Sequence, residues 1–142
     1  MKMGAMKIDK MLIAGVAAAA FNMAFGVVMN RDIFRWVYQL EPTEVWKPMS
    51  SGPNFTFMAG LLVLGVIFSF VYALIQKGIP GSNKLVKGIV FGLCVWAAGR
   101  LAGMFMIHSF ITVPTPVVVY WTILGAVKLP LEGMIVAALY GE

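Results

Sequence analysis

The sequence predicts an all-α integral membrane protein: a four-transmembrane-helix antiparallel bundle with a short interfacial segment between helices 1 and 2. The chain is 61% hydrophobic and 12% charged, whereas a soluble domain is about 45–50% apolar and about 25% charged. Its mean hydropathy is +0.88. The chain also contains four long apolar runs joined by mostly short connections, as expected for four membrane-spanning helices. We expect a single transmembrane domain that spans residues 1–142.

The four apolar runs supply the four spans. A span needs about 20 mainly apolar residues, and all must be helical because lipid offers backbone groups no hydrogen-bond partner. The first run is uncharged from Met11 to Asn30. This exceeds the roughly 7–15 apolar residues of a signal peptide, so we expect a retained helix. The expected spans are 11–29, 57–75, 88–110 and 117–140, with an extramembrane loop at 30–56.

The later connections are short and carry turn residues. Pro80 and Gly81 mark a turn between the second and third spans. Pro114 and Pro116 stop the third helix and restart the fourth. Such short connections predict antiparallel neighbouring helices.

Basic residues predict the orientation, because cytoplasmic loops carry an excess of Lys and Arg. One side would hold Lys2, Lys7, Lys10, Lys77, Lys84 and Lys87, and the other Arg31, Arg35 and Lys47. This pattern predicts that the N- and C-termini are both cytoplasmic. A prokaryotic inner membrane fits a compact chain with short loops.

The loop 30–56 mixes charges with aromatic rings, including Trp36, Tyr38 and Trp46. Aromatic rings with a polar edge favour the headgroup zone. We expect a short interfacial helix near 31–40, followed by a loop through Pro42, Pro48 and Pro53. It is either a simple membrane-anchored loop, or a docking surface or lid over the outer mouth of the bundle.

Small residues predict how the helices pack. In lipid, helices associate through close backbone approach and polar contacts. At about 100° per residue, four glycines of the third span share one stripe: Gly88, Gly92, Gly99 and Gly103. The first span has a similar series in Gly15, Ala19, Asn22 and Gly26, and the two series are expected to face each other. The contact is either within the chain or between chains.

Three charged residues are the candidate functional site. Arg100 and Lys128 fall near the middle of adjacent spans, and Glu132 lies one helical turn, roughly 6 Å, further along the fourth. A charge at the bilayer centre costs between about 3 and more than 10 kcal/mol. Pro130 lies between Lys128 and Glu132 and predicts a kink there.

Four interpretations of these charges remain open. Glu132 could pair with Lys128 on its own helix and with Arg100 across the bundle. The excess positive charge could instead meet an acid on a partner subunit, or bind an anion, or belong to a proton or ion relay. Single polar residues in the first two spans, Asn22, Ser69 and Tyr72, are expected to make interhelical hydrogen bonds.

The sequence lacks the motifs of several other functions. Cys94 is the single cysteine and His108 the single histidine, so no metal site is expected within the chain. No phosphate loop, catalytic serine motif or paired-carboxylate pattern is present. We therefore expect no enzymatic activity, no cofactor and no nucleic-acid binding.

The leading prediction is a small multi-pass protein that acts as a non-catalytic accessory or structural subunit of a larger membrane complex. Its partners would be the lipid bilayer and other membrane subunits, or further copies of itself. The alternative is a small oligomeric transporter or channel that binds an anion or couples protons through Arg100, Lys128 and Glu132. A third is a membrane enzyme whose acid is Glu132.

Overall fold

The computed structural model describes residues 6–47 and 54–141 and confirms the predicted fold class. Four helices are long and apolar enough to cross a membrane: Ile8–Ile33, Phe55–Gly78, Lys84–Phe110 and Thr115–Tyr140. Each extends up to four residues beyond the expected span at one or both ends. Large apolar side chains such as Leu64 and Phe105 are exposed along the outer faces, as a surface that contacts lipid tails requires.

The four spans divide into shorter elements. The first span consists of α1 (Ile8–Val27) and a π-helical turn, η1 (Val28–Ile33). The second is α2 (Phe55–Ile75) with a 3₁₀ turn, η3 (Gln76–Gly78). The third runs through α3 (Lys84–Val95), a second π-helical turn, η4 (Trp96–Leu101), and α4 (Ala102–Phe110). The fourth is one helix, α5 (Thr115–Tyr140), which continues through Pro130.

Local sequence signals set where the helices begin. Asn54 accepts a hydrogen bond from the backbone N–H of Phe57 at 2.8 Å, and Asn83 accepts one from Val86 at 3.0 Å. Side-chain caps of this kind satisfy backbone donors that the first turn leaves free. Pro116 stands in the first turn of α5, where a missing N–H costs nothing.

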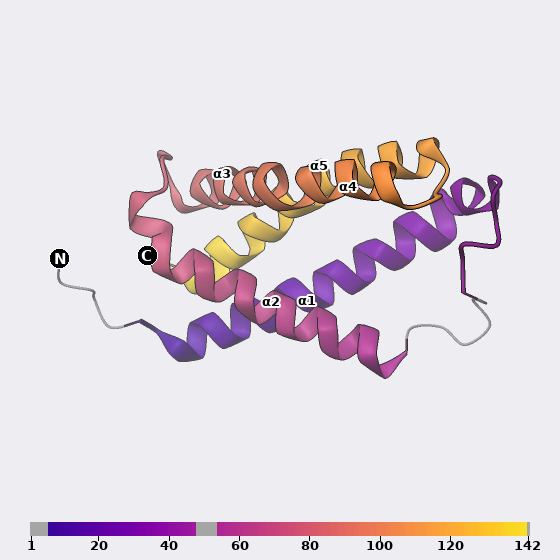
Figure 1. Ribbon diagram of the computed structural model, residues 1–142. Coiled ribbons are helices and arrows are strands. Elements are labelled where there is room, and N and C mark those ends of the chain that lie inside the picture. The colour runs from indigo at the N-terminus through magenta and orange to yellow at the C-terminus, as the bar shows by residue number, and fades with distance from the viewer. Residues whose placement is uncertain (1–5, 48–53, 142) are drawn as a thin grey trace.

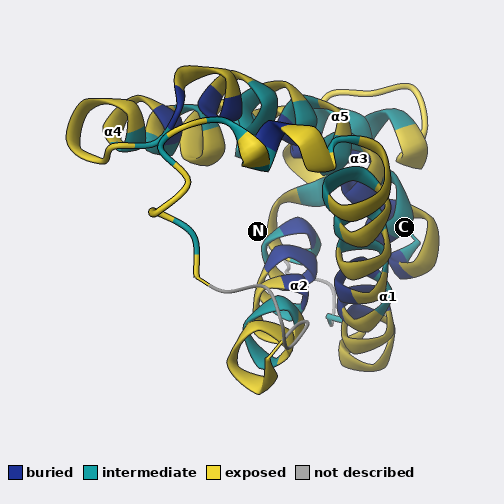
Figure 2. Cartoon of the chain, turned by 90° about the vertical axis from the view of Figure 1, so that its right-hand side faces the viewer, coloured by how far each residue is buried: buried dark blue, intermediate teal, exposed yellow. Residues whose placement is uncertain are grey.

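The helices form two antiparallel pairs that cross (Figure 1). One pair is α1 with α2, and the other is the α3–α4 span with α5. Because α5 also packs against α1, it joins the two pairs. The start of α1 and the end of α5 lie at the same end of the bundle (Figure 1). Buried residues follow the lines where helices touch, and exposed residues cover the outer faces (Figure 2).

Glycines allow the backbones of neighbouring helices to come into contact, but the helices that they bring together differ from those that the sequence predicted. A Cβ added at Gly88 would overlap the carbonyl oxygen of Gly133, and one at Gly92 would overlap that of Leu129. Gly15 meets α2 instead, where an added Cβ would lie 2.7 Å from the Cα of Val66. The expectation that the two small-residue series face each other is therefore wrong: one packs on α2 and the other on α5.

Only the first two glycines of the stripe in the third span, Gly88 and Gly92, lie at the interface with α5. No atom lies within 4 Å of a Cβ added at Gly99 or Gly103. The π-helical turn η4 explains the difference, because it inserts about one extra residue and so rotates the rest of the span by roughly 100°. Gly99 and Gly103 therefore lie outside the α5 interface that Gly88 and Gly92 occupy.

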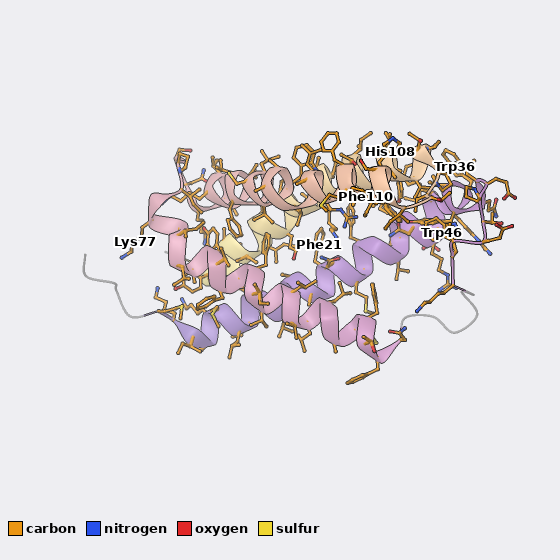
Figure 3. The ribbon with its side chains drawn as sticks, in the orientation of Figure 1. Phe21, Trp36, Trp46, Lys77, His108 and Phe110 are labelled. Atoms are coloured by element: carbon orange, nitrogen blue, oxygen red, sulfur yellow. The ribbon has the colours of Figure 1, made fainter. Side chains whose placement is uncertain are left out.

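The segment between the first two spans folds onto the bundle. A 3₁₀ helix, η2 (Arg35–Gln39), stands where a short interfacial helix was expected and packs against α5. Trp36 and Trp46 lie at this end of the bundle, and Lys77 lies at the other (Figure 3). Pro48 and Pro53 lie outside the described residues.

Candidate functional site

The three charged residues do not form an ion cluster with one another. Among the residues that the structure describes, no ion pair joins Arg100, Lys128 and Glu132. Glu132 is nevertheless only 3% exposed. A buried carboxylate needs hydrogen-bond donors in place of water, so its partner must come from elsewhere in the bundle.

Asn22 of α1 supplies that partner and links Glu132 to Lys128. Its Nδ2 donates to Oε2 of Glu132 at 3.2 Å, and its Oδ1 accepts from Nζ of Lys128 at 3.0 Å. The predicted interhelical hydrogen bond of Asn22 is confirmed. The direct pairing of Glu132 with Lys128 and Arg100 is wrong, because an amide from the neighbouring helix stands between the two charges of α5.

Ser69 and Tyr72 belong to a separate packing core. The Ser69 hydroxyl donates to the Met11 carbonyl at 2.9 Å, which confirms the predicted interhelical hydrogen bond of Ser69. The Tyr72 ring is buried against Phe91 and Tyr140, with centroids 5.4 and 6.3 Å apart. Both residues therefore stabilise the crossing of the helices.

Arg100 lies across α5 rather than in an ion pair. Its Cγ would be 3.0 Å from a Cβ added at Gly125, and the Trp96 ring would be 3.1 Å away. The Trp96 indole is held in turn by a hydrogen bond to the Thr122 carbonyl at 2.9 Å. Gly125 therefore provides the space that the Arg100 stem needs.

The charged end of Arg100 has no partner in the described part of the chain. No hydrogen bond or ion pair joins it to another described residue. The residue as a whole is exposed, although its stem packs against α5. The Arg100 guanidinium interacts electrostatically with the Tyr38 hydroxyl and with the Lys128 ammonium group. Lys128 repels it, so the two cations raise the local positive potential together.

A hydrogen-bonded aromatic cluster closes this region at the end of the bundle where η2 lies. The Tyr38 hydroxyl donates to Oδ1 of Asn30 at 2.8 Å, and the Tyr120 hydroxyl donates to the same oxygen at 3.0 Å. Nε1 of Trp121 donates to the Tyr38 hydroxyl at 2.8 Å. The Trp46 ring covers Tyr38 and Trp121 at centroid distances of 5.2 and 5.8 Å. We call these five residues the aromatic cap.

The aromatic cap was not predicted from the sequence, although Tyr38 and Trp46 were noted among the aromatic residues of the first loop. Trp121 shares a helix face with Lys128. Asn30 joins them, because the π-helical turn η1 places it at the end of the first span. Burial raises the pKa of Tyr38, while the hydrogen bond from Trp121 and the charge of Arg100 oppose that rise.

The remaining candidates lie on the outer surface. Cys94 is a free and exposed thiol. His108 lines an open apolar groove of about 330 Å³ between α4 and α5, with Met104 and Val118 among its other residues. Within residues 6–47 and 54–141, no group of three or more His, Cys, Asp and Glu side chains lies together.

Comparisons with known protein families, with curated proteins and with solved structures find no match for this chain.

Proposed function

We propose that this four-span membrane protein is a non-catalytic subunit of a larger membrane complex. One observation carries the proposal: Arg100 presents a positive charge near the middle of a membrane span without an ion pair or hydrogen bond among the described residues. Such a charge is costly in lipid unless a partner neutralises it. A carboxylate on a neighbouring subunit supplies that neutralisation.

The rest of the charged region supports a structural role for the centre of the bundle. Glu132 and Lys128 already have hydrogen-bond partners in Asn22. Four members of the aromatic cap, namely Asn30, Tyr38, Tyr120 and Trp121, are likewise joined by hydrogen bonds, whereas the buried Nε1 of Trp46 has no hydrogen-bond partner among the described residues. Arg100 is the charged residue of this region whose partner we place on another subunit.

The runner-up is a small oligomeric transporter or channel. Two cations and one acid near the middle of the spans, with the acid linked to Lys128 through an amide, favour the binding of an anion or the transfer of a proton. In that case Arg100→Gln abolishes flux in vesicles that contain the purified protein alone. A subunit of a complex has no flux of its own to lose.

The two functions differ first in the particle that the chain forms. The protein is extracted from its native membrane in mild detergent, and the mass and composition of the particle are measured. We expect a heteromeric particle with defined stoichiometry. A homogeneous particle that contains only this chain would contradict the proposed function and favour the transporter.

A further inference from the structure

We infer that Arg100 and Lys128 together bind one carboxylate, which an Asp or Glu near the middle of a transmembrane helix of a different protein supplies. This inference rests on the proposed function, since it names the chemical group of the partner and the two residues that hold it. The carboxylate lies over the face of α5 around Gly125, where η4 and α1 both contact that helix. Position, free donors, charge balance and open space support it.

Arg100 and Lys128 lie over the same face of α5. The Arg100 stem packs at Gly125, and Lys128 follows Gly125 by three residues, about 4.5 Å along the helix. The guanidinium interacts electrostatically with the Lys128 ammonium group and with the Tyr38 hydroxyl, so its charge stays near this face. The two oxygens of one carboxylate can therefore contact both cations.

Both cations have hydrogen-bond donors that the described part of the chain leaves free. Arg100 makes no hydrogen bond there, and its guanidinium matches a carboxylate with two parallel N–H donors. Lys128 donates to Oδ1 of Asn22 at 3.0 Å. An ammonium group has three N–H donors, so two of those of Lys128 remain for a ligand.

The charge of the region requires one further acid. Arg100 and Lys128 share their depth with one acid, Glu132, which is 3% exposed and bonded to Asn22. One positive charge is therefore in excess, and one carboxylate balances it.

Neither this chain nor a lipid headgroup supplies that acid. The other described acids lie near the ends of the spans or in the loop: Asp9, Asp32, Glu41 and Glu44. A second copy of the chain therefore has no free acid at this depth in the described residues. Lipid phosphates lie about 15 Å from the middle of the membrane, because the hydrocarbon core is about 30 Å thick. The carboxylate therefore belongs to a different protein.

Space for the incoming group lies beside Gly26 of α1. Gly26 is four residues from Asn22, which bonds Lys128, and four from Asn30 of the aromatic cap. A Cβ added at Gly26 meets only the Asn30 amide, at 3.8 Å. A glycine with open space beside it lets a second helix approach closely, which brings the carboxylate of that helix toward Lys128.

The test uses a tagged full-length chain expressed in its native membrane. Arg100→Gln and Lys128→Gln each remove one charge, and Lys77→Gln is the matched control, because Lys77 is exposed at one end of the bundle (Figure 3). We expect each of the first two to lower the yield of the co-purified protein by about tenfold or more, with Lys77→Gln near wild type. Lys128→Arg keeps the charge and should keep the partner.

A steric variant tests the open space separately. Gly26→Leu fills the space beside Asn30, and Gly60→Leu is its control, because a Cβ at Gly60 of α2 meets nothing within 4 Å. Gly26→Leu should lower the recovery of the partner and Gly60→Leu should not. Thermal unfolding of the purified chain should be similar for Gly26→Leu, Gly60→Leu and Arg100→Gln, because none of these sites loses an internal hydrogen bond.

The acid of the recovered protein completes the test. The partner should carry an Asp or Glu near the middle of a span, and replacing that acid with its amide should lower recovery as much as Arg100→Gln does. Once the acid is replaced, Arg100→Gln and Lys128→Gln should have little further effect, because the three groups form one contact.

The remaining outcomes separate this inference from the proposed function. Retention of the partner by Lys128→Gln, or by Arg100→Gln, overturns the shared carboxylate site while the proposed complex stands. Recovery of an untagged second copy, or of bound lipid alone, in a way that depends on both cations also overturns it. A wild-type chain that co-purifies with no other protein contradicts the proposed function itself.

Discussion

Asn22 is the residue that links the two charged side chains of α5 to the neighbouring helix. Its amide donates to Glu132 and accepts from Lys128, so one side chain of α1 satisfies two charges of α5. It also ties the two helix pairs together, because α1 belongs to one and α5 to the other. A membrane interior makes such a bridge valuable, since water is not there to replace it.

Replacing Asn22 with Ala should therefore lower the free energy of unfolding by about 1–3 kcal/mol, because Glu132 and Lys128 both lose a buried partner. Reversible unfolding in mixed micelles measures the change. Ser109→Ala is the control, since the exposed Ser109 hydroxyl bonds only to the Phe105 carbonyl of its own helix. Equal effects of the two substitutions would contradict the bridging role of Asn22.

The aromatic cap makes a prediction about pH. Because burial raises the pKa of Tyr38 above its ordinary 10.0, folding favours the neutral phenol. The contribution of Tyr38 to stability is complete below pH 10 and is lost as the pH rises through the folded-state pKa.

The titration of Tyr38 can be measured from tyrosinate absorbance. The difference between the titration curves of the wild type and of Tyr38→Phe should show one tyrosine with a pKa above 10.0. Since the positive charge of Arg100 lowers this pKa, Arg100→Gln should raise it further. A Tyr38 that titrates below 10.0, or ignores the Arg100 substitution, would contradict the arrangement.

At the scale of helices, the contact between α3 and α5 depends on glycines that face backbone atoms directly. The sequence pattern correctly predicted Gly88 and Gly92 as packing residues. It failed for Gly99 and Gly103 because a regular helix turns about 100° per residue, and nothing in the sequence of 96–101 indicates a π-helical turn. The sequence also could not predict which helix each glycine contacts, because several helices carry small residues that would allow close packing.

Gly92→Ala should accordingly destabilise the bundle by about 1–3 kcal/mol, because its methyl group would overlap the Leu129 carbonyl and push α3 away from α5. Gly60→Ala should be neutral or slightly stabilising, since its methyl group meets open space and glycine is a poor helix former. Thermal unfolding of both variants in detergent provides the comparison. A Gly92→Ala protein as stable as Gly60→Ala would show that the backbones do not touch there.

At the scale of the whole molecule, the sequence predicted the number of spans and the positions of the charges along them. It could not predict which polar groups meet, because Asn22 and Glu132 are separated by 110 positions and no local pattern links them. The same applies to the aromatic cap, whose members come from the first span, the loop and α5. Composition and length determine the spans, whereas the contacts depend on how the two helix pairs cross.

The four spans make a prediction about sidedness. Thr43 and Ser82 are exposed residues in the first and second connections, which lie at opposite ends of the bundle. In a Cys94→Ala background, Thr43→Cys should react with an impermeant thiol reagent from outside the cell. Ser82→Cys should react only after the membrane is opened, because its connection carries Lys77, Lys84 and Lys87. Labelling of both from the same side would contradict the four-span topology, and the reverse pattern would contradict the orientation.

The most direct test of the central claim asks what lies beside Arg100 and Lys128 in the native membrane. A photo-crosslinking residue is placed at Gly26, where an added Cβ meets only the Asn30 amide, and for comparison at Leu64, which is exposed on α2. Illumination of intact membranes should attach a second, acid-bearing membrane protein at position 26 and lipid at position 64. Lipid adducts alone at both positions would mean that the two cations have no protein partner, and the account would fail.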